Sequence, residues 1–236
     1  MVFAGLLAGG KGERVGSATA KQFLELDGRP MVGYPLELFC SLPEIDRVIV
    51  ACNPDYMATM ESIVAGCRVG ADKVSLVPGG ATRHASVMNI LRRVLAETAA
   101  PEDKFILHEA ARPLLDAETV RSHIDALQHH EATNTLFPVV DTIMLSDDGE
   151  YIREVADKKK CFVGQNPQGY VLGRLLERLG EDLDSVHNPD DTDLCGLFMQ
   201  NGGQVKIVRG NERLFKVTYP ADLDLVRRFI GGGQPA

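Results

Sequence analysis

Residues 2–16 read VFAGLLAGGKGERVG. The first seven form a continuous apolar run, which is typical of a buried parallel β-strand, and a cluster of glycines follows at once. Glycines permit a sharp turn that directs backbone N–H groups at phosphate oxygens, and Lys11 and Arg14 add positive charge. The spacing G-G-x-G-x-R matches neither the P-loop nor the dinucleotide-binding fingerprint. The stretch therefore predicts a first strand leading into a polyphosphate-binding loop, with a plain strand-to-helix connection as the alternative.

Further short apolar runs alternate with helical patterns along the rest of the chain. The runs cover residues 47–51, 74–77, 105–107 and 205–208, and the helical patterns cover about 31–41, 56–65, 83–97, 117–130, 191–199 and 220–230. Strands that alternate with helices form βαβ units, whose parallel strands lie in one sheet between layers of helices. We therefore predict an α/β fold with a doubly wound, mostly parallel sheet. The length of 236 residues fits one large domain or two small ones, and we predict a single domain over residues 1–236.

One segment breaks the alternation of strands and helices. Residues 134–170 show no helical period, and two β-rich runs, 135–145 and 150–163, flank the turn Ser146-Asp147-Asp148-Gly149-Glu150. An Asp-Gly pair between such runs is a strong hairpin signal. A hairpin that projects from an α/β core cannot bury both of its faces alone. We predict a β-arm at about residues 135–163 that is covered by the same arm of a second subunit, with an arm folded back on its own domain as the alternative.

The composition excludes several classes of partner. The formal net charge is −8 and the pI is near 5.3, so nucleic acid and an acidic membrane surface are not expected as partners. No apolar run approaches the roughly 20 residues that a membrane span needs. The five cysteines are odd in number and scattered, without C-x-x-C spacing, which indicates reduced thiols in a cytoplasmic protein.

Three other segments carry groups suited to a nucleotide. Residues 79–86, GGATRHAS, follow the third strand and open a helix, so their backbone and the Ser86 hydroxyl can meet a base edge. Residues 108–113, HEAARP, follow the fourth strand, where open α/β sheets place ligands. Lys21 precedes the apolar pair Phe23-Leu24, and from there its ammonium can reach a triphosphate; an ordinary solvated lysine is the alternative.

Together, the patterns L-A-G-G-x-G-x-R-x-G at residues 7–16 and K-Q-F-L at residues 21–24 resemble the sugar-phosphate nucleotidyltransferases. The chain looks closest to the cytidylyltransferases that act on methylerythritol 4-phosphate or ribitol 5-phosphate. Residues 79–87, 108–113, 139–143, 164–168 and 210–218 are similar to further segments of that family, so the resemblance covers nearly the whole chain. It implies a Rossmann-like nucleotidyltransferase fold, CTP and a small polyol phosphate as substrates, Mg²⁺ as the divalent cation, and a homodimer formed through the β-arm.

The resemblance also implies a role for each matching residue. It places the catalytic, phosphate-facing cations at Arg14, Lys21 and Lys216, and the metal-side acid at Glu109. Nucleotide contacts fall at Leu7, Ala8, Gly9, Gly10, Lys11, Gly12, Gly80, Arg83, Ser86 and Ala110. Acceptor contacts fall at Arg112, Asp141, Thr142, Lys158 and Asn166, where Arg112 can equally brace its own turn. The implied reaction is in-line attack of an acceptor phosphate oxygen on the α-phosphate of CTP, which needs positioning and charge neutralisation more than a nucleophilic side chain.

The sequence departs from the family pattern at four positions. Glu109 stands for an Asp, Asn166 for a Thr and Leu214 for an Asn, and Lys158 stands for an Arg whose bidentate fork a lysine lacks. Residues 3–10, 164–168 and 192–195 look more like the ribitol 5-phosphate branch, which we therefore favour. The methylerythritol 4-phosphate branch is the alternative, and a nucleotide-binding module that has lost activity is a further one.

Overall fold

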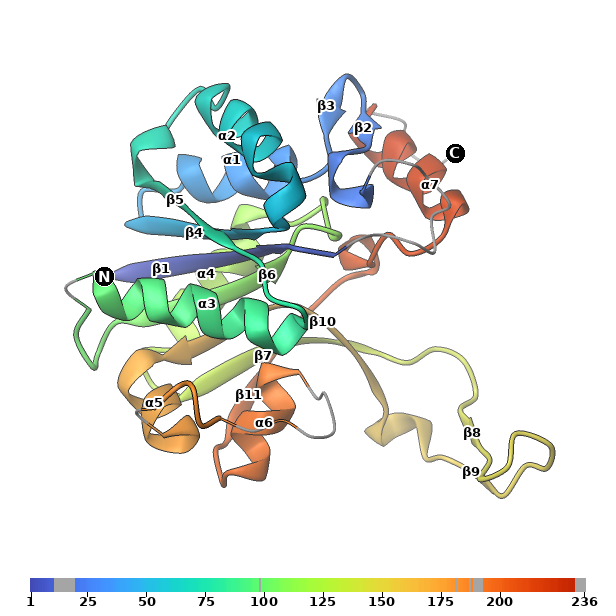
Figure 1. Cartoon of the computed structure of the whole chain (residues 1–236). Coiled ribbons are helices and arrows are strands. Elements are labelled where there is room, and N and C mark those ends of the chain that lie inside the picture. Colours follow the sequence, from blue (N-terminus) through green and yellow to red (C-terminus); the bar gives the residue numbers. More distant parts are fainter. Residues whose placement is uncertain (11–19, 98, 181, 187, 189–192, 232–236) are drawn as a thin grey trace.

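The computed structural model describes residues 1–10, 20–97, 99–180, 182–186, 188 and 193–231, and these include a seven-stranded sheet. Its strands lie in the order β11-β7-β10-β6-β1-β4-β5 (Figure 1). Every neighbouring pair is parallel except the two pairs that involve β10. The strand bounds are Val2–Ala8 (β1), Arg47–Cys52 (β4), Val74–Pro78 (β5), Lys104–Glu109 (β6), Ala132–Pro138 (β7), Phe162–Val171 (β10) and Val205–Arg209 (β11). The predicted fold class, a doubly wound and mostly parallel sheet, is confirmed.

Helices cover both faces of the sheet, and strand β1 shows why. Its side chains alternate between the two faces, so Ala4, Leu6 and Ala8 join one apolar cluster while Phe3 joins the other. The first cluster is completed by α1 (Gly33–Ser41), α2 (Met57–Ala65) and α4 (Ala117–Ala126). The second is completed by α3 (Arg83–Ala96), α5 (Leu172–Leu179) and α6 (Leu194–Gln200). A strand buried on both faces explains the continuous apolar run at the start of the sequence.

Smaller elements surround the carboxyl end of β1. A two-stranded sheet, β2 (Glu25–Leu26) with β3 (Arg29–Pro30), packs with the last helix, α7 (Pro220–Ile230), in a third apolar cluster. Five short 3₁₀ helices are also present in the described chain: Lys21–Phe23 (η2), Pro54–Tyr56 (η3), Ala71–Lys73 (η4), Lys158–Lys160 (η5) and Glu212–Leu214 (η6). Through this packing residues 215–230, near the end of the sequence, lie against residues 24–34, near its start (Figure 1).

The prediction for residues 134–170 was wrong in one respect. Strands β7 and β10 belong to the central sheet, so the projecting arm begins after Pro138 and ends before Phe162 instead of spanning 135–163.

The buried part of β7 carries polar side chains, which are not typical of a buried strand. Thr133 and Thr135 are fully buried, and their hydroxyls lie 2.7 Å from the two ring nitrogens of His123. The helix α5, over Leu172–Leu179, was also not predicted from the sequence.

The arm itself has the predicted hairpin. Strand β8 (Met144–Leu145) pairs antiparallel with β9 (Glu154–Val155), and the turn between them holds Gly149 at a φ of 77°. Figure 1 shows the arm extending away from the body of the chain, so the alternative of an arm folded back on its own domain is not observed. Its apolar side chains are open to solvent, with Val140, Tyr151 and Ile152 exposed by 72%, 75% and 64%. Monomeric proteins rarely expose apolar side chains in such a group.

Two predictions from composition concern the whole chain. All five cysteines lie among the described residues and are unpaired, and three of them are buried. Within the described ranges, no helix combines the length and the apolar character needed to cross a bilayer. The cytoplasmic location stays a prediction.

Candidate active site

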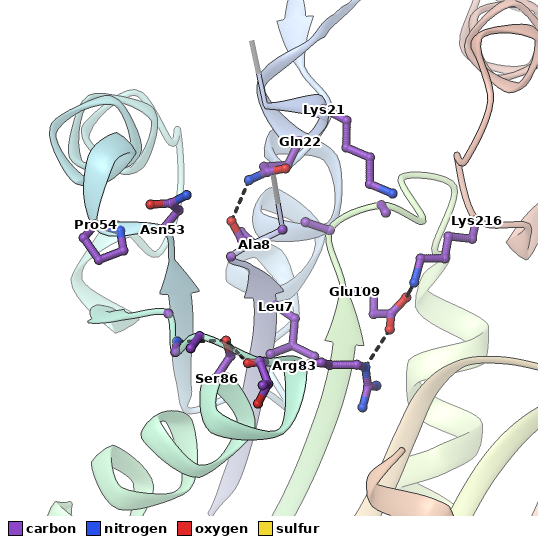
Figure 2. A pocket seen from close by; sticks show the side chains of 18 residues that line it. Leu7, Ala8, Lys21, Gln22, Asn53, Pro54, Arg83, Ser86, Glu109 and Lys216 are labelled. Atoms are coloured by element: carbon purple, nitrogen blue, oxygen red, sulfur yellow. Dashed lines mark hydrogen bonds and ion pairs between the residues drawn. The ribbon is translucent and has the colours of Figure 1, made fainter. Parts of the chain in front are cut away.

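A pocket of about 770 Å³ opens at the carboxyl ends of the parallel strands β1, β4, β5 and β6 (Figure 2). This edge is where ligands bind in open α/β sheets, because the loops that leave adjacent strands meet there. Most residues predicted as catalytic, nucleotide-binding or metal-binding line this one pocket, although they come from separate segments. They are Leu7, Ala8, Gly9, Gly10, Lys21, Gly80, Arg83, Ser86, Glu109, Ala110 and Lys216.

The loop after β5 is held against the start of helix α3, and it lies close to the loop after β1, where a Cβ on Gly9 would be 3.4 Å from Ser86 Oγ. A Cβ on Gly80 would lie 2.3 Å from the Cβ of Ala85, so only glycine fits there without a shift of the backbone. The Ser86 hydroxyl accepts a hydrogen bond from the Gly80 N–H and donates one to the Thr82 carbonyl, each at 3.0 Å. Thr82 in turn caps helix α3 by accepting from the Ala85 N–H at 3.0 Å. Ser86 therefore lines the pocket and also holds the backbone of the loop that forms this part of its wall.

Lys21 is placed by the residue that follows it. Gln22 is buried, and its Nε2 donates to the Ala8 carbonyl at 2.8 Å, which fixes the 3₁₀ helix η2 against the end of β1. The Lys21 ammonium donates to the Val217 carbonyl at 3.0 Å. This bond brings Lys21 next to the segment that carries Lys216, so two cations from opposite ends of the sequence lie on one side of the pocket.

Glu109 joins two further cations at the pocket floor. Its carboxylate lies 2.7 Å from Lys216 Nζ and accepts from Arg83 Nε at 2.9 Å (Figure 2). Burial on its own would raise the pKa of this carboxyl, but the charge of Lys216 and then that of Arg83 outweigh burial and lower the pKa to about 2. Glu109 is therefore ionised at neutral pH. The three side chains together carry a single net positive charge, with both cations held at fixed positions.

Arg112 follows the pocket residues Ala110 and Ala111 and joins three separate segments of the chain. Its guanidinium donates to the carbonyls of Leu214 and Gly164, at 2.6 and 3.3 Å. Its own carbonyl lies 3.0 Å from Nε2 of the fully buried His108, whose pKa burial lowers to about 4. These contacts support the bracing role that was the alternative for Arg112. Leu214 takes part in this contact through its carbonyl, while its side chain is buried in the core.

None of the residues predicted to contact the acceptor is among the described residues that line the pocket. Asp141, Thr142 and Lys158 are exposed on the arm, where Lys158 Nζ donates to the Val140 carbonyl at 3.1 Å. Asn166 is buried in β10, and its Nδ2 donates to the Gln165 carbonyl at 2.7 Å. Their roles stay predictions, as do those of Lys11, Gly12 and Arg14, which lie outside the described residues.

The structure also adds residues that sequence reasoning missed. Asn53 and Pro54 line the pocket directly after β4, and the buried Gln22 lines it beside Lys21. A signal for Asn53 existed, because it follows a predicted parallel strand at the edge where ligands bind. Gly79, Ala81, Thr82 and Ala111 complete the lining, next to residues that were predicted.

Comparison with known proteins agrees with this arrangement. The sequence matches the family model described as IspD, 2-C-methyl-D-erythritol 4-phosphate cytidylyltransferase, over residues 2–231. The fold is similar to that of 4-diphosphocytidyl-2C-methyl-D-erythritol synthase from Anaerococcus prevotii, with a TM-score of 0.80, 22% identity and 98% of each chain covered. It is also similar to 2-C-methyl-D-erythritol 4-phosphate cytidylyltransferase from Thermus thermophilus, with a TM-score of 0.72, 27% identity, and 97% of this chain and 98% of that chain covered. The family match includes every strand and helix that forms the pocket, and the chain therefore belongs to the 2-C-methyl-D-erythritol 4-phosphate cytidylyltransferase family and is a CTP-dependent cytidylyltransferase.

Proposed function

We propose that the protein transfers CMP from CTP to 2-C-methyl-D-erythritol 4-phosphate and releases pyrophosphate. The observation that carries this proposal is the family match over residues 2–231, which includes the pocket and the arm. It favours this acceptor over ribitol 5-phosphate, which the sequence motifs had suggested. Ribitol 5-phosphate is kept as the alternative acceptor, because the residues expected to bind the acceptor include the departures Lys158 and Asn166.

The reaction proposed is in-line attack by a phosphate oxygen of the acceptor on the α-phosphorus of CTP. The new P–O bond forms as the bond to the leaving pyrophosphate breaks, and the acceptor phosphate is already ionised, so no general base is needed. Negative charge builds on the α-phosphate and on the pyrophosphate. Lys21 and Lys216 line the pocket from one side and are the described cations best placed to offset it. Lys11 and Arg14 are proposed to add to them from the glycine-rich loop.

We further propose that Mg²⁺ assists. Among the described residues, no group of three or more His, Cys, Asp or Glu is placed to hold a metal ion, and Glu109 is the one acid that lines the described pocket. This donor set fits an ion that binds mainly to the triphosphate and water, since Mg²⁺ commonly takes only one or two protein carboxylates. Glu109 is the residue that would hold it, after giving up part of its pairing with Lys216 or Arg83. The ion would neutralise phosphate charge, and activity should be lost in excess chelator.

The arm supports a composite site in a homodimer. Its exposed apolar side chains need a cover, and a second copy of the arm offers the same apolar surface. In that arrangement Asp141, Thr142 and Lys158 serve the pocket of the partner subunit. This proposal explains why these three residues are not found among the described residues that line the pocket of their own chain.

One experiment tests the acceptor and the reaction together. Purified protein with Mg²⁺ is given each of four nucleoside triphosphates against 2-C-methyl-D-erythritol 4-phosphate, ribitol 5-phosphate and glycerol 3-phosphate, and pyrophosphate release is measured. The proposal expects release with CTP and the methylerythritol phosphate at a kcat/KM far above every other pair. Preference for ribitol 5-phosphate would restore the first hypothesis. Binding of CTP without turnover on any acceptor would instead support the alternative that the protein is a nucleotide-binding module that has lost activity.

A further inference from the structure

The pocket has two unlike ends. Lys216, Arg83 and the Glu109 that joins them lie at one end. The other end is neutral and is built where β4 and β5 finish, from Asn53 and Pro54 with the adjacent glycine loop. Figure 2 shows Asn53 across the pocket from Lys216. A triphosphate is drawn to the cations, so the base, at the far end of the nucleotide, reaches the neutral side.

The side-chain amide of Asn53 is fixed in orientation. Its Oδ1 accepts a hydrogen bond from the Asp55 N–H at 3.0 Å, and its backbone carbonyl accepts one from the Tyr56 N–H at 2.9 Å. With the oxygen held there, the amide nitrogen must lie on the other side, which in Figure 2 is the side nearer Gln22. Among the described residues, none accepts a hydrogen bond from Asn53 Nδ2, and the residue is half-buried. A donor fixed before the ligand arrives loses little conformational entropy on binding.

We propose that Asn53 is a further nucleotide-binding residue, whose Nδ2 donates a hydrogen bond to an acceptor atom on the base of CTP. Cytosine offers a carbonyl oxygen and a ring nitrogen as acceptors, and the neighbouring Pro54 adds an apolar surface beside them. The proposed donor is the side-chain amide of Asn53 and not the backbone N–H groups at the start of η3. The helix only holds this amide in place, through the bond from the Asp55 N–H. The inference rests on the use of CTP and not on the identity of the acceptor, so a wrong acceptor would leave its test unaffected.

The test compares two substitutions by calorimetric titration of the full-length protein with CTP and Mg²⁺. In Asn53→Ser the hydroxyl can still accept from the Asp55 N–H, as serine does at helix starts, but it is too short to reach the base. We expect the Kd for CTP to rise about tenfold, as for loss of one hydrogen bond. In Asn53→Asp the cap and shape are kept while the donor becomes a charged acceptor, so the Kd should rise further. Turnover at saturating CTP should change less than about twofold, because the contact is made equally before and during the reaction.

A matched control is available at Asn211, which does not line the pocket. It begins the 3₁₀ helix η6 and caps it in the same way, accepting from the Arg213 N–H at 2.9 Å. Asn211→Ser should bind CTP as tightly as the unaltered protein does. Titration with 2′-deoxy-CTP separates base from ribose, because a contact to the base gives the same loss of affinity in Asn53→Ser with either nucleotide. An unchanged Kd in both Asn53 variants, or a loss that vanishes with 2′-deoxy-CTP, would overturn the proposal.

Discussion

Replacing Glu109 by glutamine tests whether one buried carboxylate holds the two cations at the pocket floor. The Glu109 side chain is 11% exposed and pairs with Lys216 and Arg83 at 2.7 and 2.9 Å. Glutamine keeps the shape but removes the charge, so two neighbouring cations lose their common counter-charge. Removing one partner from a buried ion pair typically costs about 3–5 kcal/mol, because the remaining charge is left uncompensated.

The size of the effect can also be judged from the lowered pKa of Glu109. The fall of its pKa from 4.5 to about 2 corresponds to about 3 kcal/mol of preferential stabilisation of the charged form. Lys216 and Arg83 are 37% and 29% exposed, so solvent screens part of the penalty and the lower end of the range applies. We expect Glu109→Gln to lower the free energy of unfolding by about 3 kcal/mol at pH 7.

The pH dependence gives the prediction a sign that can be checked. The folded pKa of Glu109 lies below its unfolded value, so its contribution is complete above about pH 4.5 and is lost as the pH falls toward 2. The difference between the two proteins should therefore be full at pH 6 and smaller at pH 3. Urea unfolding followed by circular dichroism at both pH values measures it.

An exposed ion pair supplies the control for this measurement. Arg153 and Asp147 meet at 2.9 Å on the arm, with side chains 56% and 69% exposed. Surface pairs of this kind contribute little, so Asp147→Asn should leave the unfolding curve almost unchanged. If Glu109→Gln unfolds at the same urea concentration as the unaltered protein at pH 7, the carboxylate does not hold the cations and the reasoning fails.

Three further predictions follow from other parts of the structure. Lys21→Ala should lower kcat about a hundredfold or more with the fold intact, because a charge-stabilising group is lost where charge builds; near-normal turnover would remove Lys21 from the site. Lys158→Ala should raise the KM of the acceptor far more than that of CTP, and mixing it with Lys21→Ala subunits should restore activity only after subunit exchange; no recovery despite exchange would refute the composite site. Burial, with a smaller contribution from the nearby His108, lowers the pKa of His123 to about 3, so stability should fall as the pH drops below about 6.5. In His123→Gln the slope of unfolding free energy against pH between 6 and 4.5 should be shallower by up to about 1.4 kcal/mol per pH unit, and an unchanged slope would show that His123 takes up its proton in the folded state.

The part of the site that could be predicted from the sequence is the part that depends on short stretches of neighbouring residues. The apolar run before the glycines predicts strand β1, and the rule that ligands bind at the carboxyl ends of parallel strands places Gly80 and Glu109 beside it. What could not be predicted depends on contacts between distant segments. The residues around Glu109 in the sequence do not indicate that it pairs with both Lys216 and Arg83. Strand β7 was missed because its threonines are polar, and they can be buried only because their hydroxyls bond to His123. A buried polar strand has the composition of an exposed one.

The cations proposed to bind CTP and the cation proposed to bind the acceptor lie in different parts of the chain. Two of the described pocket cations, Lys21 and Lys216, come from the two ends of the sequence and line the same pocket, so the described residues proposed to bind CTP all belong to one subunit. Lys158 instead lies on a projecting arm whose apolar side chains are exposed. Such an arm is marginally stable alone, and covering it with a second copy would stabilise it and bring its polar residues to a pocket at the same time. In the proposed dimer, acceptor binding therefore depends on assembly while CTP binding does not. For this reason an active site can take Lys21 from one subunit and Lys158 from the other.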